Sequence, residues 1–241
     1  MFNNLLTNLS LYFAKPNSQS YLKVDTDHEI YVESWGNPKG ECFIYLHGGP
    51  GGDVDKSNLR WFNLKKHHVV LFEQRACNRS RGDFYTNNTT WDMVEDINKI
   101  KEHFNINNFN LFGGSWGSCL ALAYAIKYPT NVKNLYLWGL LLGNKADTTF
   151  LPEELLSPEE KFFCEHLFFF EEDDWILKNC SSLKEININL AHGKKDVVCN
   201  YTNATKLKEK LPHINLYIEE EGYHSSHSPG IEKFLKEQIK I

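Results

Sequence analysis

The chain has no apolar run long enough to span a membrane, so its 241 residues contain no candidate transmembrane helix. It also lacks an excess of basic residues. Asp and Glu (31) outnumber Lys and Arg (26), and the net charge of −5 argues against a general nucleic-acid or anionic-membrane surface. The first six residues have no basic region, and asparagines interrupt their apolar residues. A cleaved signal peptide is therefore not expected.

Cysteine pairs with metal-binding spacing are missing too. The six cysteines are scattered and form no C-x-x-C pair, which favours reduced thiols in a cytoplasm over a disulfide framework or a zinc site. The glycine-rich residues 47–52 match neither G-x-x-x-x-G-K-[ST] nor G-x-G-x-x-G, which disfavours a phosphate-binding loop. We therefore expect no metal, nucleotide or other cofactor.

What the chain does contain is the G-x-S-x-G sequence GGSWG at residues 113–117, centred on Ser115. Residues 108–112 before it are rich in apolar side chains and predict a strand, and residues 118–126 after it predict a helix. In this strand-turn-helix setting, a sharp turn exposes the serine hydroxyl at the top of a sheet as a nucleophile. The alternative interpretation is a turn of small residues that only packs a helix on a strand.

Short apolar runs alternate with helical patterns along the rest of the chain. Strands are predicted at residues 20–26, 28–35, 42–46, 69–72, 108–112, 132–138, 186–191 and 214–219, and helices at 90–104, 118–126, about 200–211 and 229–239. The first two strands read as a β-hairpin. The order of elements predicts a doubly wound α/β fold with a mostly parallel central sheet flanked by helices.

Residues 144–182 break this alternation. They contain two prolines, several acidic residues and the aromatic residues Phe162, Phe163, Phe168, Phe169, Phe170 and Trp175. We interpret them as a small, mostly helical insertion, called the cap, that lies over the strand ends where ligands bind in open sheets. The α/β core then comprises residues 1–143 and 183–241.

A serine is a weak nucleophile unless a base removes its proton, and in this class of sheet an acid and then a histidine follow the serine along the chain. Asp196 follows the strand at 186–191, and His224 follows the strand at 214–219. His224 is therefore the candidate base and Asp196 the residue that orients it. Among the other histidines, His192 and His47 are expected to have structural roles, His47 by shaping the loop that follows it. The alternative for Asp196 is a solvated loop acid or a helix cap.

The tetrahedral intermediate of acyl transfer needs hydrogen-bond donors for its oxyanion. The glycines of residues 47–52 follow the third predicted strand and let backbone N–H groups approach a substrate closely. The expected donors are the N–H groups of Gly49 and of Trp116, the residue after the nucleophile.

Together these motifs resemble the prolyl aminopeptidases (proline iminopeptidases), serine peptidases of the α/β-hydrolase fold. The matching stretches are residues 21–24, 36–38, 47–52, 70–75, 88–92, 113–125, 192–199 and 224–225. By this resemblance, Ser115, Asp196 and His224 fall on the family's catalytic triad. It implies an enzyme that removes an N-terminal residue, preferentially proline, from peptides through an acyl-enzyme.

The resemblance also implies residues that bind the substrate. In the family, carboxylates of the cap hold the free amino group, and residues 163–168 look like the counterpart of one such segment. Glu165 is therefore the candidate amine anchor, with a solvated helix acid as the alternative. A position after the sixth strand that often carries a pocket aromatic holds Leu141. The cap is shorter than in typical members, and a second family carboxylate has no match.

Two other functions stay open from the sequence. A shorter cap and Leu141 would suit an esterase or amidase with a wider pocket for small amides and esters. A hydrolase fold that only binds a partner is the second alternative, although the intact Ser115, Asp196 and His224 speak against it. A homo-oligomer could cover the aromatic residues at 162–175, which would then form an interface in place of a pocket wall.

Overall fold

A computed structural model describes residues 13–49, 51–144, 161 and 170–240. Within these residues one eight-stranded sheet has the order β1-β2-β4-β3-β5-β6-β7-β8. Its strands are β1 (Ser18–Lys23), β2 (Glu29–Gly36), β3 (Glu41–Leu46), β4 (His67–Phe72), β5 (Phe109–Ser115), β6 (Val132–Leu140), β7 (Asn187–Gly193) and β8 (Asn215–Glu219). Strand β1 pairs antiparallel with β2, and β2 with β4, whereas every later pairing is parallel. The predicted hairpin and the mostly parallel sheet are thus confirmed.

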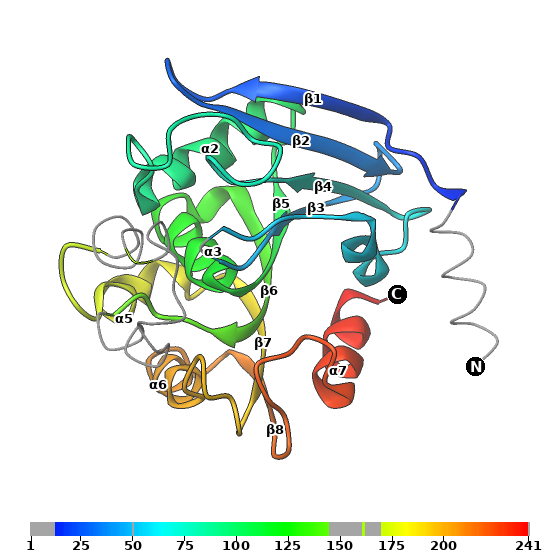
Figure 1. Cartoon of the computed structure of the whole chain (residues 1–241). Helices are drawn as coiled ribbons and strands as arrows, with labels where there is room; N and C mark the ends of the chain where they lie inside the picture. Colours follow the sequence, from blue (N-terminus) through cyan, green and yellow to red (C-terminus); the bar gives the residue numbers. More distant parts are fainter. Residues whose placement is uncertain (1–12, 50, 145–160, 162–169, 241) are drawn as a thin grey trace.

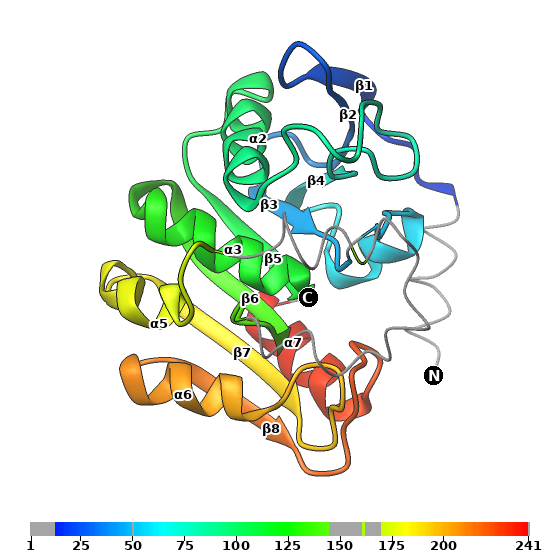
Figure 2. The same cartoon turned by 60° about the vertical axis from the view of Figure 1, so that its left-hand side comes forward.

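Helices cover both faces of this sheet. They are η1 (Lys56–Trp61), α2 (Thr90–His103), α3 (Trp116–Lys127), η2 (Pro129–Asn131), α5 (Trp175–Asn179), η6 (Cys180–Leu183), α6 (Thr202–Lys210) and α7 (Pro229–Ile239). Helices α2, α3, α5 and α6 lie on one side of the sheet, and α7 lies on the other with η1 (Figures 1 and 2). Two helical layers around a mostly parallel sheet bury both of its faces, which is why its central strands are largely apolar.

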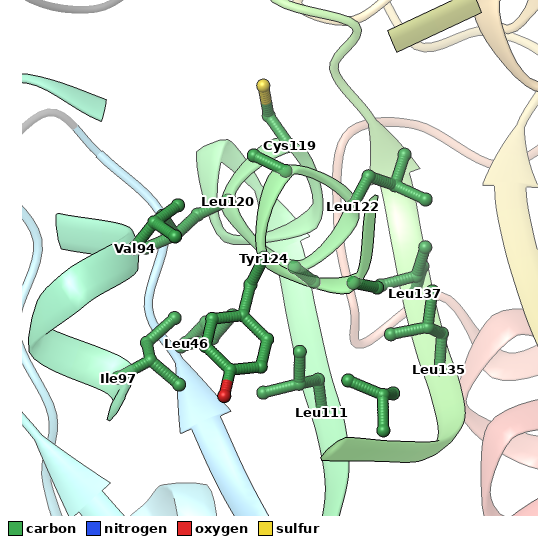
Figure 3. Close-up of a cluster of buried hydrophobic side chains, with 14 of the residues drawn as sticks. Leu46, Val94, Ile97, Leu111, Cys119, Leu120, Leu122, Tyr124, Leu135 and Leu137 are labelled. Carbon is green, nitrogen blue, oxygen red and sulfur yellow. The ribbon is translucent and has the colours of Figure 1, made fainter. Parts of the chain in front are cut away.

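The larger hydrophobic core fills the space between the sheet and helices α2 and α3 (Figure 3). Tyr124 of α3 lies between Ile97 of α2 and Leu111 of β5 in this cluster. Helix α3 is apolar all round and almost completely buried, as expected for a helix with neighbours on every side. Because α3 begins directly after Ser115, this packing fixes the position of the serine.

A second core lies on the opposite face, between the sheet, η1 and α7. Trp61 of η1 packs on Phe112 of β5 with ring centroids 5.1 Å apart, and Ile231 and Leu235 of α7 are buried in the same cluster. The two clusters hold the sheet between them. They leave the ends of its strands as the place where loops can carry polar residues.

The carboxyl ends of the parallel strands β3, β4, β5, β6, β7 and β8 meet at one edge of the sheet, which we call the C-terminal edge. Four of these strand ends carry the predicted serine, acid, histidine and oxyanion segments. Residues 47–52 follow β3, Ser115 ends β5, Asp196 follows β7 and His224 follows β8. Parallel pairing alone therefore gathers segments that are far apart in the sequence.

Most of the predicted cap lies outside the described residues, among them Phe162, Phe163, Phe168 and Phe169. Its last part, residues 170–182, is described. Phe170 and Trp175 stack with centroids 4.6 Å apart, and both rings contact Trp91 of α2. Ile176 is buried in the larger core. This end of the segment therefore packs onto the helical layer of α2 and α3.

In the part of the chain that the structure covers, no helix is both long and apolar enough to cross a bilayer. The five cysteines of this part (Cys42, Cys77, Cys119, Cys180 and Cys199) are all buried. Cys164 lies outside it.

Candidate active site

Ser115 stands at the junction of β5 and α3 in a conformation that few residues adopt, with φ 55° and ψ −128°. The glycines around it make this junction sterically feasible. A Cβ atom on Gly113 would lie 2.4 Å from the Gly117 carbonyl oxygen, and one on Gly117 would lie 2.2 Å from that of Leu46. Such strain persists only where the surrounding structure enforces it, and it is concentrated at functional sites. The sharp turn predicted around Ser115 is thus present.

The backbone around Ser115 is tied to the end of β6. The Ser118 hydroxyl donates to the Ser115 carbonyl oxygen at 2.6 Å, and the Leu141 N–H donates to the Ser118 hydroxyl at 3.1 Å. Leu141, the predicted pocket residue, is buried and belongs to the larger hydrophobic core. A substrate contact for Leu141 stays a prediction.

Asp196 and His224 meet at the C-terminal edge. The Nδ1 atom of His224 lies 2.7 Å from Oδ2 of Asp196, and the carboxylate is fully buried whereas the imidazole is 19% exposed. The other carboxylate oxygen, Oδ1, accepts the N–H groups of Val198 at 2.9 Å and Cys199 at 2.8 Å. A buried acid can thus orient an imidazole that still reaches the open side of the site.

The pKa of Asp196 lies well below its usual range. Burial by itself raises this pKa, but hydrogen bonds from His192, His224 and the Cys199 N–H stabilise the charged form more strongly and lower it. The carboxylate therefore carries its charge at any pH at which an imidazole base would work.

His192 also reaches Asp196, which sequence reasoning missed. Its Nε2 atom lies 3.3 Å from Asp196 Oδ2 and 2.9 Å from the Cys199 carbonyl oxygen, while its Nδ1 atom accepts the Leu140 N–H at 3.1 Å. Since Nδ1 accepts, the ring proton sits on Nε2 and points toward the two oxygens. The only signal in the sequence was a histidine at the end of a strand, four residues before the acid.

Strand β6 connects the His224–Asp196 pair to Ser115. Ser115 pairs with Leu140 of β6, and the Trp138 ring contacts the His224 ring with centroids 5.5 Å apart. A Cβ atom on Gly139 would lie 3.1 Å from Cε1 of His224. The three predicted triad residues thus flank one strand end. Among the described residues, no hydrogen bond joins the Ser115 hydroxyl to the His224 ring, a contact that often forms only when substrate is bound.

The loop after β3 lies directly against the serine turn. A Cβ atom on Gly48 would lie 3.4 Å from the Ser115 Cβ, and one on Gly49 would lie 3.9 Å from Cδ1 of Trp116. The chain folds back at Gly52 so closely that a Cβ atom added there would lie 2.1 Å from the Gly48 carbonyl oxygen. The two predicted oxyanion donors, the N–H groups of Gly49 and Trp116, therefore belong to touching segments.

Glu165, the predicted amine anchor, lies outside the described residues. Across the described part of the chain, no three or more His, Cys, Asp or Glu side chains are grouped so that they could hold a metal ion. The chemistry available at the C-terminal edge is that of a serine, an imidazole and a buried carboxylate.

Comparisons with known proteins agree with the fold described above. A family model described as the alpha/beta hydrolase fold matches residues 41–163. A proline iminopeptidase of Arabidopsis thaliana is 30% identical over 294 aligned positions, which cover 90% of this chain and 77% of that protein. A proline iminopeptidase of Neisseria meningitidis serogroup A is 44% identical over 140 residues, 58% of this chain and 45% of the relative.

Among solved structures, an esterase from Exiguobacterium antarcticum superposes with a TM-score of 0.72. The superposition covers 92% of this chain and 98% of that one at 20% identity. A likeness at this level of identity concerns the fold alone.

Proposed function

This chain belongs to the alpha/beta hydrolase fold family, and from that premise we propose that it is a serine aminopeptidase of the prolyl aminopeptidase type. It releases an N-terminal residue, preferentially proline, from peptides through an acyl-enzyme. The single observation that carries this proposal is the 2.7 Å contact between His224 and a buried Asp196, placed beside the strained Ser115. Relatives named as proline iminopeptidases support the choice of substrate.

In the proposed mechanism the Ser115 hydroxyl attacks the carbonyl carbon of the first peptide bond. His224 takes the proton of the hydroxyl through Nε2, and Asp196 holds the ring by Nδ1 and stabilises its charged form. The N–H groups of Gly49 and Trp116 stabilise the oxyanion. His224 then gives its proton to the leaving amine, and water hydrolyses the acyl-enzyme with His224 again as the base.

The chain is shorter than its full-length relative. The alignment with the Arabidopsis protein takes 294 positions, more than the 241 residues of this chain, so that protein contains segments without a counterpart here. We propose that residues 144–182 form a reduced cap and that Glu165 holds the free amine of the substrate. If so, Glu165→Gln should abolish the preference for free over blocked amines and leave the turnover of blocked substrates unchanged.

The proposal is tested with a panel of aminoacyl arylamides, each with a free and a blocked amine. We expect the highest kcat/KM for the free prolyl arylamide and no activity in Ser115→Ala. A serine away from the site offers a control: Ser182→Ala changes an exposed hydroxyl on η6, which contacts the end of α3 opposite Ser115, and should leave activity unchanged. Equal rates on all residues, or unchanged activity in Ser115→Ala, would contradict the proposal.

The shorter chain also supports one alternative, an esterase or amidase with a wider pocket. Brisk turnover of p-nitrophenyl acetate without cleavage of prolyl β-naphthylamide would favour this alternative. A protein that only binds a partner would fail to react with a fluorophosphonate, whereas the proposed enzyme is labelled stoichiometrically at Ser115.

A cytoplasmic location is also part of the proposal, and the scattered cysteines, which form no C-x-x-C pair, support it. Fractionation of cells that produce the protein tests it. Oligomerisation of the chain stays a prediction, to be tested by its mass in solution.

A further inference from the structure

Gln74 lies at the C-terminal edge, two residues after β4, and its side chain is almost completely buried. It sits between the loop after β3 and the serine turn, the two segments that carry the proposed oxyanion donors. Neither the sequence motifs nor the proposed mechanism gives this glutamine a role.

Three hydrogen bonds join Gln74 to these two segments. Its side-chain Nε2 donates to the His47 carbonyl oxygen at 2.9 Å, and its backbone N–H donates to His47 Nε2 at 2.9 Å. Its side-chain Oε1 accepts the indole N–H of Trp116 at 2.8 Å. One residue thus holds the loop before Gly49 and the residue after Ser115 at the same time.

The chemistry of these partners requires a carboxamide at position 74. A backbone carbonyl oxygen can only accept a hydrogen bond, and an indole N–H can only donate one. The side chain between them must therefore offer one donor and one acceptor. Glutamate has no donor, and methionine, which has nearly the same length, has neither a donor nor a strong acceptor.

The contact with His47 continues to the first oxyanion donor. Because His47 Nε2 accepts the Gln74 N–H, the ring proton is on Nδ1, which donates to the Gly48 carbonyl oxygen at 2.7 Å. Burial of His47 keeps its pKa low and the ring neutral. The carbonyl of Gly48 and the N–H of Gly49 belong to one planar peptide group. Fixing this carbonyl therefore fixes the direction of the Gly49 N–H.

The contact with Trp116 fixes the second donor. The indole ring is fully buried, and the backbone N–H of the same residue is the other proposed oxyanion donor. We propose that Gln74 is a positioning residue that sets the spacing of the two oxyanion N–H groups by binding His47 and Trp116 together. It contacts no substrate atom. This inference rests on the proposed function, since it assumes acyl transfer to Ser115.

The test compares Gln74→Met and Gln74→Glu with the wild-type enzyme on a prolyl arylamide. We expect Gln74→Met to lower kcat by about 10- to 100-fold with KM within about threefold, because the oxyanion forms only on the way to the intermediate. Gln74→Glu keeps the length of the side chain and an acceptor for Trp116, but it places an acceptor against the His47 carbonyl oxygen, so it should lower kcat at least as much as Gln74→Met.

A second measurement separates positioning from a purely structural role. The boronic acid analogue of proline forms a tetrahedral adduct with the serine and needs the oxyanion donors, whereas prolinol binds without them. Gln74→Met should weaken the boronate by the same factor as kcat and leave prolinol unchanged. An equal loss of affinity for both inhibitors, or no loss for either, would overturn the inference.

Gln19→Met is the matched control. The Gln19 side chain also makes two hydrogen bonds, to Tyr31 and Glu33, but it lies on the edge strand β1. It should change neither kcat nor boronate affinity.

The rate of labelling by a fluorophosphonate keeps the two proposals apart. This reaction uses Ser115 and the oxyanion donors but needs no proline pocket. If the wild-type protein is not labelled, the proposed function fails. If it is labelled and folded Gln74→Met is labelled at the same rate, the inference about Gln74 fails while the proposed function stands.

Discussion

His192 Nε2 lies 3.3 Å from the same Asp196 oxygen that His224 Nδ1 contacts at 2.7 Å. Two imidazoles from different positions of the chain thus share one carboxylate oxygen. Only His224 is partly exposed, and His192 is fully buried. His192 therefore holds the Asp196 carboxylate from the protein interior, whereas His224 lies on the side that a substrate can reach.

We expect His192→Leu to lower kcat/KM about 10-fold, within the ~0.5–3 kcal/mol range of coupled residues. The loss should be smaller in an Asp196→Asn background, because the carboxylate that His192 holds is then already changed. A double-mutant cycle measures this coupling. His213→Leu is the control, since this histidine contacts the Ile186 carbonyl oxygen and lies away from the C-terminal edge. Additive losses would show that His192 does not act through Asp196.

Asp196→Asn by itself should lower kcat by about 10⁴-fold, as expected when the orienting acid of a triad is neutralised. The expected cause is the wrong tautomer of His224, because an amide can donate to Nδ1. Steady-state kinetics on a prolyl arylamide measures the loss. Glu221→Gln breaks an exposed ion pair with Lys195 near the same loops and should leave kcat unchanged. A loss below tenfold in Asp196→Asn would argue for a different acid.

A substitution at Gly139 of β6 tests whether this strand sets the position of the His224 ring. It has φ +53°, and an added Cβ would lie 3.1 Å from His224 Cε1. Gly143 has φ +76°, and its Cβ would lie 3.0 Å from Cys119 Sγ and from Phe170. Alanine at either position should lower the free energy of unfolding by about 1–2 kcal/mol, because both residues take a left-handed conformation.

Only Gly139→Ala should displace His224. We expect its kcat/KM to fall up to about 100-fold, the cost of a shift of about 1 Å in a catalytic group. Gly143→Ala is the matched control and should keep most of its activity. Denaturant unfolding and steady-state kinetics on both variants give the comparison. Equal activities would mean that β6 does not set the position of the imidazole.

Because His47 is buried, we expect the folded protein to become less stable in mild acid. Burial lowers its pKa below the ordinary value of 6.5, opposed only in part by the hydrogen bond to Gly48. As the pH falls through 6.5, His47 therefore binds a proton in the unfolded chain but stays neutral in the folded chain. The free energy of unfolding therefore decreases as the pH decreases in this range, by at most ~1.4 kcal/mol per pH unit for one such group.

Urea unfolding between pH 7 and pH 5 measures this slope. His47→Asn should have a shallower slope than the wild type, whatever its stability at pH 7. Some slope should remain, because burial also lowers the pKa of His67 and His68. His103→Asn, which changes an exposed ring, is the control. Identical slopes in the wild type and His47→Asn would contradict the prediction.

Local sequence predicted most of the elements. Apolar runs marked β3 and β4, and the 3.6-residue period of Met93, Ile97 and Ile100 marked α2. The boundaries differ by a few residues, since β6 extends to Leu140, and helix α3 begins at Trp116 and not at Ser118. The last residues of the predicted cap, 175–182, pack on α3, a contact that the sequence pattern did not indicate.

Local motifs in the sequence identify the chemical groups of the candidate site and their order along the chain. A serine between glycines, then an acid and a histidine after later strands, needs no coordinates to be recognised, because each group follows from a local motif. Which of these groups contact one another depends on the folded arrangement of the strands and loops. Gln74 reaches His47 across 27 residues and Trp116 across 42, and His192 reaches the Leu140 N–H across 52. Parallel pairing of distant strands creates these contacts, and no local pattern encodes them.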